Sequence, residues 1–258
     1  MSAVRGFVML LAVLAVAVLP APAEAGRRPF IWVYDTEIVP KGDVELEQWL
    51  WAKARAPGLE GRRSSYWVWW GPVFGLTQRL ELAVPFQVLA TRDTTRLDSF
   101  EADLRLRLNP RGDDSPWQPL LRVAWHQSIH SAQPSGVNAN LVQSYQWDSG
   151  LRLALDLGAQ VGLPALRGSE EPARLLGTYA AGVSYPVFGE EEELRGSLEA
   201  FGEIPLQGIP GGQHHFVGAD LAWTFGRSWV TLGVMVGLTP LFPETPQFMP
   251  RLIWAVAL

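Results

Sequence analysis

The sequence predicts an all-β protein, a closed antiparallel transmembrane barrel of 12 strands. Apolar and polar residues alternate over segments of about ten residues, and this period of two is typical of strands with one apolar face. Short turns and longer loops join these segments in alternation, as in outer-membrane barrels. The composition agrees, because the 258 residues are 48% hydrophobic and only 18% charged.

The first 25 residues predict a secretory signal peptide. Arg5 gives a positive start, residues 7–19 are apolar, and Ala23-Glu24-Ala25 fits the rule for cleavage between small residues. The apolar run is shorter than the roughly 20 residues that a membrane-spanning helix needs. We therefore expect cleavage after Ala25 and export into a Gram-negative envelope.

Residues 26–41 precede the first expected strand and allow two interpretations. Phe30, Trp32 and Tyr34 give this segment apolar surface to bury, which favours a plug inside the barrel. Chain termini are often frayed, which favours a periplasmic extension. Both alternatives stay open at this point.

Residues 42–258 form the expected barrel, and residues 151–163 show its pattern most clearly. Leucine, alanine and valine occupy one parity of this segment, whereas Arg152 and Asp156 lie on the other. The 12 strands are expected to begin near Gly42, Tyr66, Arg79, Leu97, Gln118, Val137, Gly150, Ala173, Glu193, His214, Ser228 and Gln247. Four short turns begin with aromatic residues, which are typical of a membrane interface: Phe74, Trp147, Phe188 and Phe225.

The charged parity is expected to face the barrel interior, because a charge at the bilayer midplane costs roughly 2–4 kcal/mol. With both termini periplasmic, the expected pore-lining residues are Glu47, Asp103, Arg105, Arg122, Asp156, Glu199 and Asp220. Acids and bases on this face are balanced, which has two interpretations. Salt bridges fill a narrow interior, or acidic and basic walls face each other across an open pore. The balance predicts no ion selectivity.

Two stretches resemble a known group of outer-membrane barrels. Phe74-Gly-Leu-Thr-Gln-Arg-Leu-Glu-Leu-Ala-Val-Pro-Phe86 is similar to the strand–turn–strand signature of the transporters grouped as "MetA-pathway of phenol degradation"-like. Val39-Pro-Lys-Gly-Asp-Val-Glu-Leu-Glu-Gln-Trp49 resembles the first strand of that group. The resemblance implies an outer-membrane transporter-like barrel and no catalytic residues. The chain departs from many outer-membrane proteins by ending in Leu258 rather than Phe or Trp.

The function expected from these features is passive passage of a small solute. One alternative is a structural or adhesion barrel that does not conduct. Another is a lipid hydrolase, because His126, Ser128 and Asn140 have the spacing of the outer-membrane phospholipase A family. In that chemistry Ser128 is the nucleophile, His126 the base and Asn140 the residue that orients the imidazole. That family carries Asn-Gly after the serine, where this chain has Ile129, and it attacks lipid from the outer wall. We therefore expect no enzyme.

Composition limits the partners further. Lys and Arg number 21 against 26 Asp and Glu, so the net charge of −5 argues against a basic nucleic-acid binder. The absence of cysteine excludes disulfides and thiolate metal sites. His130, His214 and His215 fall near loops and are expected to be solvated, with no metal or cofactor. The expected partners are membrane lipids, the outer-membrane assembly machinery and a small-molecule solute, and no nucleic acid.

Overall fold

A computed structural model describes residues 28–53, 65–91, 94–109, 115–129, 135–163, 174–188, 193–207, 212–238 and 247–258. The predicted signal peptide and His130 lie outside these ranges. The strands are β1 (Val44–Lys53), β2 (Ser65–Gly75), β3 (Leu80–Ala83), β4 (Phe86–Ala90), β5 (Thr95–Arg107), β6 (Trp117–Ser128), β7 (Gly136–Gln146), β8 (Arg152–Gly162), β9 (Arg174–Phe188), β10 (Leu194–Gln207), β11 (His214–Phe225), β12 (Ser228–Gly237) and β13 (Phe248–Ala257).

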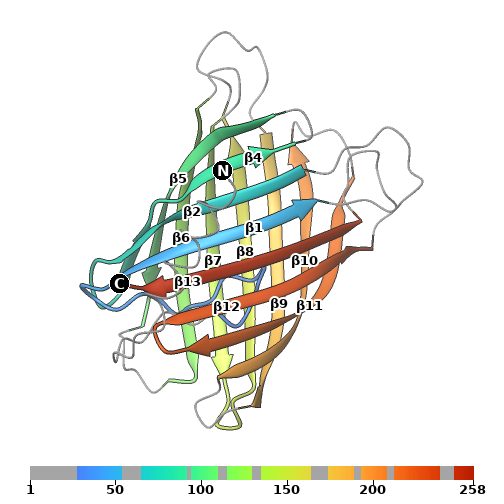
Figure 1. Ribbon diagram of the computed structural model, residues 1–258. Helices are drawn as coiled ribbons and strands as arrows, with labels where there is room; N and C mark the ends of the chain where they lie inside the picture. Colours follow the sequence, from blue (N-terminus) through green and yellow to red (C-terminus); the bar gives the residue numbers. More distant parts are fainter. Residues whose placement is uncertain are drawn as a thin grey trace, which may run out of the picture.

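The strands form one closed antiparallel sheet (Figure 1). From β5 to β13 each strand pairs with the next along the chain, β3 and β4 both lie between β2 and β5, and β1 pairs with both β2 and β13, so the ends of the sheet meet. Closure leaves no unpaired sheet edge, which is what a lipid environment demands of a spanning sheet. The predicted barrel of 12 strands is confirmed, with β3 and β4 as two parts of the third strand. Every expected start lies within two residues of the observed one.

The third strand is interrupted, which the sequence pattern did not predict. β3 and β4 both pair with β2 on one side and β5 on the other, but Val84 and Pro85 between them are not in the ladder. Pro85 has no N–H to donate, so the pairing must break there. Its carbonyl still accepts a hydrogen bond from the Glu101 amide at 2.9 Å, which keeps the wall continuous.

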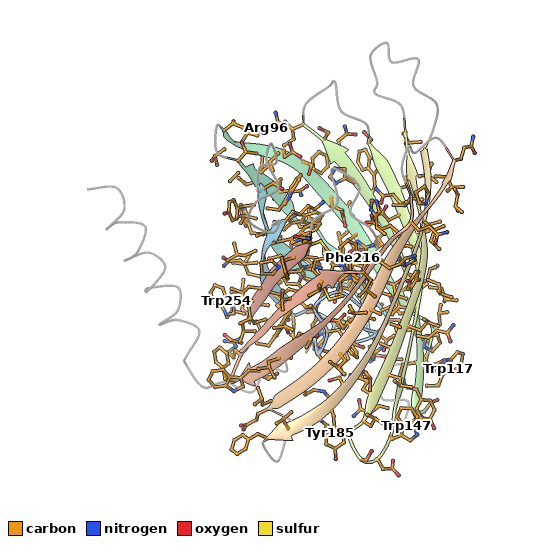
Figure 2. The ribbon with its side chains drawn as sticks, turned by 90° about the vertical axis from the view of Figure 1, so that its right-hand side faces the viewer. Arg96, Trp117, Trp147, Tyr185, Phe216 and Trp254 are labelled. Atoms are coloured by element: carbon orange, nitrogen blue, oxygen red, sulfur yellow. The ribbon has the colours of Figure 1, made fainter. Side chains whose placement is uncertain are left out.

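Alternation decides which side chains face outward. In β8, Leu155 is 40% exposed on the outer wall, whereas the adjacent Asp156 is 4% exposed in the interior. Figure 2 shows Trp117, Trp147 and Tyr185 on the outside near the end where the short turns lie. This outer wall of aliphatic residues with aromatic residues near one end matches the surface of a membrane barrel. Among the described residues, no helix is long and apolar enough to cross a membrane.

Residues 28–41 lie inside the barrel, and we call them the interior segment. Figure 1 shows this segment in blue behind the front strands. Phe30 and Val33 pack against Ala180, Phe201 and Met235 of the barrel wall. Ile38 packs against a second group of inward residues at the opposite wall. The aromatic and aliphatic residues of this segment therefore supply much of the apolar interior.

Candidate functional site: the barrel interior

One carboxylate of the wall holds the start of the interior segment. The Glu199 carboxylate in β10 accepts hydrogen bonds from three successive backbone amides, those of Ile31 at 2.7 Å, Trp32 at 2.9 Å and Val33 at 2.6 Å. Such turned-in backbone N–H groups form an anion-binding concavity, and bonds to a charged acceptor are stronger than neutral ones. Glu199 therefore fixes the chain where it crosses the interior.

Further polar contacts hold the rest of the segment. Arg152 in β8 forms ion pairs with Asp35 at 2.7 Å and with Glu37. Burial raises the pKa of the Asp35 carboxyl, and the Arg152 guanidinium opposes that rise. At the other end, the Val39 amide donates to Glu81 at 2.7 Å. The segment is thus bonded to the wall at both ends and in the middle.

The wall is also shaped to receive the segment. A Cβ atom at Gly182 in β9 would lie 2.6 Å from the Phe30 ring and 3.2 Å from Val33. Both distances are too short for ordinary packing, so only glycine leaves room for Phe30 here. The close fit is a second sign that the interior segment belongs to the folded barrel.

Buried ion pairs fill the interior next to the segment. Arg105 bonds Glu81 at 2.7 Å and Asp103 at 3.3 Å. Arg122 bonds the same Asp103 at 2.9 Å and Glu101 at 2.8 Å. Removing one member would leave the others charged and unpaired in a dry interior. This part of the barrel is therefore a connected network of buried charges.

Tyr34 of the interior segment covers this network. Its ring lies 4.0 Å from the Arg122 guanidinium carbon and 5.5 Å from that of Arg105. Burial raises the pKa of the Tyr34 phenol above its ordinary range, so the ring stays neutral. The contact is a cation–π interaction, which adds to the ion pairs beneath it.

All seven residues expected to line a pore are buried in the interior. Glu199 binds the interior segment, and Glu47 pairs with Arg28 at 2.7 Å. Asp220 is buried opposite Ser197 in the neighbouring strand. The other four, Asp103, Arg105, Arg122 and Asp156, belong to one network. Asn140 joins Asp156 to this network, because its amide bonds Arg122 and donates to Asp156 at 2.7 Å. That these residues line an open pore stays a prediction.

The residues of the hydrolase alternative are not assembled for catalysis. Asn140 pairs across the sheet with Arg122, four residues along β6 from His126, which is roughly 13 Å away at the usual strand rise. Its amide bonds Arg122 and Asp156, so it does not orient the imidazole. Ser128 is buried on the inward face and contacts the Asp98 carbonyl. The arrangement gives the lipid hydrolase no support.

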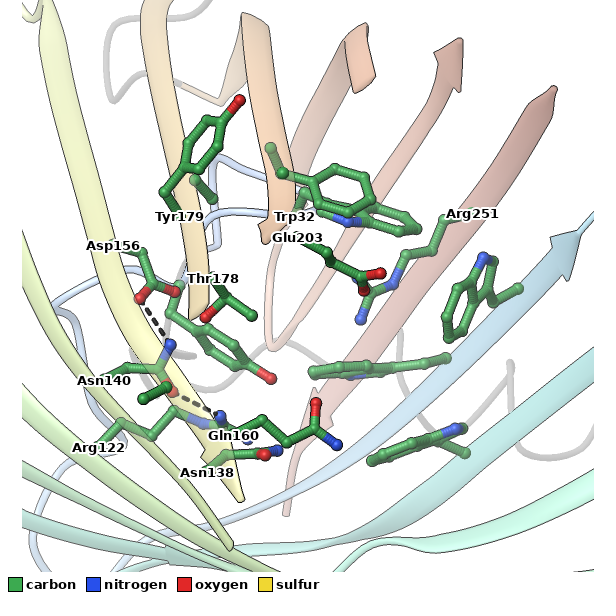
Figure 3. Close-up of a pocket in the computed structure, with 18 residues that line it drawn as sticks. Trp32, Arg122, Asn138, Asn140, Asp156, Gln160, Thr178, Tyr179, Glu203 and Arg251 are labelled. Atoms are coloured by element: carbon green, nitrogen blue, oxygen red, sulfur yellow. Dashed lines mark hydrogen bonds between the residues drawn. The ribbon is translucent and has the colours of Figure 1, made fainter. Parts of the chain in front are cut away.

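Two cavities lie on either side of the interior segment. The first has a volume of about 260 Å³ and lies toward the strand ends that the longer connections join (Figure 3). The second has a volume of about 650 Å³ and lies at the end with the short turns, between Glu37, Arg107 and Arg152. The segment separates them, with Trp32 and Tyr34 facing the first cavity and Thr36 and Glu37 facing the second.

A stack of five rings and one cation runs along one side of the first cavity, and we call it the aromatic stack; all of its members except Phe216 line the cavity. In order across the barrel it contains Trp69, Trp49, Arg251, Trp32, Phe201 and Phe216, with neighbouring centres 4.4–5.9 Å apart. Sequence reasoning missed this feature. The signal was present, because Trp49 and Trp51 share the inward parity of Glu45 and Glu47 in β1.

The histidines do not assemble a metal centre in the part of the chain that the structure describes. The His214 ring lies 3.7 Å from the Glu203 carboxylate. The His215 ring shares a hydrogen bond of 2.7 Å with the Tyr179 hydroxyl. These contacts place both rings at the rim of the first cavity rather than around a common point.

Solved structures with a similar fold are outer-membrane proteins. The NanC porin matches with a TM-score of 0.58 at 6% identity, over 83% of this chain and 100% of that chain. An outer-membrane channel from Pseudomonas putida F1 matches with a TM-score of 0.62 at 13% identity, over 89% of this chain and 100% of that chain. At these identities the similarity shows the fold alone. No protein-family model and no curated protein matches the chain.

Proposed function

We propose that the protein is an outer-membrane channel through which small solutes pass passively. The observation that carries this proposal is a closed barrel with an aliphatic outer wall, a charged interior and a cavity on each side of the interior segment. The solved structures with a similar fold, which are a porin and a channel, support it. The same proposal has three further parts. The predicted signal peptide directs export, the barrel assembles into the outer membrane, and the chain is a member of the "MetA-pathway of phenol degradation"-like group.

The interior segment controls passage in this proposal. It lies between the two cavities, so a solute must displace part of it to cross the barrel. Glu199 is the residue to mutate, because its carboxylate alone accepts hydrogen bonds from three amides of the segment. Replacing the carboxylate with a neutral amide weakens these bonds, since bonds to charged groups contribute about 1.5–3 kcal/mol each against about 1 for neutral ones.

Single-channel recording in planar bilayers tests the proposal. The folded full-length protein is expected to give discrete conductance steps, and Glu199→Gln is expected to spend more time open. Glu203→Gln is the matched control, because it makes the same charge change four residues along β10. A folded, heat-modifiable protein that never conducts, with or without Glu199→Gln, overturns the channel and favours a structural barrel.

The same vesicles test the hydrolase alternative. Release of fatty acid from phospholipid that depends on Ser128 would establish the enzyme, despite the distance between Asn140 and His126. The channel proposal expects no release above that of empty vesicles.

A further inference from the structure

We infer that the first cavity binds the carboxylate of a small organic acid with a compact apolar body, and that Arg251 is the residue that anchors it. This inference rests on the proposed function, because it names the class of solute that the channel takes. Three observations carry it, namely the environment of Arg251, the engagement of the nearby carboxylates and the lining of the cavity.

Arg251 presents only the edge of its guanidinium group. The group lies 4.5 Å from the centre of the Trp32 ring and 4.4 Å from that of Trp49, so indoles lie against it. Its Nε atom is buried without an acceptor, and the side chain reaches from β13 into the cavity beside Trp32 (Figure 3). A guanidinium held between rings keeps its N–H donors in one plane, which matches the two oxygens of a carboxylate.

Two acids of the interior whose charges act on Arg251, Glu47 and Glu199, already bind other groups. Glu47 accepts bonds from Arg28 and from the Trp49 indole, and Glu199 accepts three amides of the interior segment. Among the residues that the structure describes, Arg251 forms no ion pair, whereas Arg105 and Arg122 form two each. A cation inside a barrel without an anion is costly, and a bound anion would remove that cost.

The other carboxylates at the cavity leave room for an anion. Asp156 is held by Asn140 at 2.7 Å on the opposite wall. Glu203 lies at the rim, where its side chain is 44% exposed and faces His214. Water screens a carboxylate in such a position, so its repulsion of a bound anion is weak.

The lining defines the rest of the ligand. Trp51, Trp69 and Phe201 give an apolar wall, and the indole N–H groups of Trp51 and Trp69 have no acceptor. The opposite wall carries the side chains of Gln160 and Thr178. The described lining of this cavity of about 260 Å³ is mostly apolar and includes Arg251 as its one cation without an ion pair, which fits a compact acid better than a long chain or a polar cation.

Titration calorimetry on the folded full-length protein in detergent tests the site, with benzoate as the probe. Benzamide, which has the same ring and no charge, is expected to bind at least about tenfold more weakly, because the charge-assisted bond to Arg251 is lost. Benzylamine is expected not to bind. Cyclohexanecarboxylate is expected to bind like benzoate, since an apolar body and not an aromatic ring is required.

Variants distinguish a specific contact between benzoate and Arg251 from a general effect of positive charge. Arg251→Gln is expected to lower benzoate affinity by about tenfold or more. Arg251→Lys is expected to recover part of the loss, because it restores the charge without the planar fork. Lys53→Gln is the control, since it removes one positive charge from β1 at a side chain that does not line the cavity. Each variant is first shown to be folded by its heat-modifiable band.

Equal binding of benzoate and benzamide, or equal losses in Arg251→Gln and Lys53→Gln, overturns the inference. The failure is distinguishable from failure of the proposed function. A protein that conducts but does not bind benzoate remains a channel without this site. A protein that binds benzoate but never conducts has the site, and the channel proposal is then wrong.

Discussion

Two parts of the barrel interior treat charge in opposite ways. Around the interior segment, Arg105, Arg122 and Arg152 are all paired with carboxylates, and Tyr34 and Asp35 of the segment contact them. In the first cavity, Arg251 lies between indoles and forms no ion pair within the described chain. Within the described residues, the cations that contact the interior segment are therefore paired, whereas the first cavity keeps one cation without an ion pair. We propose that this difference distinguishes a structural part of the interior from a ligand-binding part.

Reversing one charge in each part of the interior is expected to give the largest difference in unfolding free energy. Asp103→Lys removes the acid that Arg105 and Arg122 share and adds a third cation, so we expect a loss of about 3–5 kcal/mol in unfolding free energy. Glu203→Lys makes the same reversal at the rim of the first cavity and is expected to cost less than about 1 kcal/mol, because the side chain is half-exposed. Denaturant titration followed by tryptophan fluorescence measures both. Equal losses would show that the two parts do not differ.

The comparison requires that alternate residues face inward, and β8 tests this requirement. Leu155→Arg places a charge on the outer wall and is expected to cost roughly 2–4 kcal/mol in a bilayer. Asp156→Asn, one residue away in the interior, keeps a polar partner for Asn140 and is expected to cost much less. Folding yield into vesicles and the denaturation midpoint report the two effects. If the ranking is reversed, the assignment of faces is wrong.

A smaller change tests how tightly the interior segment is seated. Gly182→Ala brings a methyl group to 2.6 Å from the Phe30 ring, and overpacking of this kind costs about 1–3 kcal/mol. Gly177→Ala in the same strand is the control, because its nearest neighbour would be a Leu206 side-chain atom at 3.4 Å. Hydrogen exchange of residues 28–41 should rise in Gly182→Ala only. Unchanged exchange would mean that Phe30 shifts without loosening the segment.

The smallest expected effect on stability is that of Arg251→Gln. The variant loses contacts with three indoles, each worth about 0.5–2 kcal/mol, but it also removes an unpaired buried cation, which offsets that loss. We therefore expect a change of less than about 1 kcal/mol in unfolding free energy without ligand, measured by the same denaturant titration. A loss as large as that of Asp103→Lys would mean that Arg251 is a structural residue like Arg105 and Arg122.

The alternation of residue types was sufficient to determine the wall. A strand in a barrel has only two faces, so each residue's parity assigned it to lipid or interior, and Leu155 and Asp156 lie as predicted. The number of strands was also predictable, because each alternating segment of about ten residues is long enough to span a membrane once, and there are 12 such segments. The break at Pro85 is the local exception, because a missing N–H interrupts pairing without changing the parity pattern that surrounds it.

Only the tertiary structure decided what the interior contains. Parity states that Glu199, Trp49 and Arg251 point inward, but not which of them meet, because that depends on strand tilt and closure. The three amides bound by Glu199 lie more than 160 positions earlier in the chain, and no local pattern links them. The same holds for Arg251, whose indole neighbours come from β1 and from the interior segment. The sequence by itself determined a barrel with an apolar outside and a charged inside. Closure of the sheet around residues 28–41 decided which charges are paired among the described residues, and it left Arg251 between indoles without an ion pair.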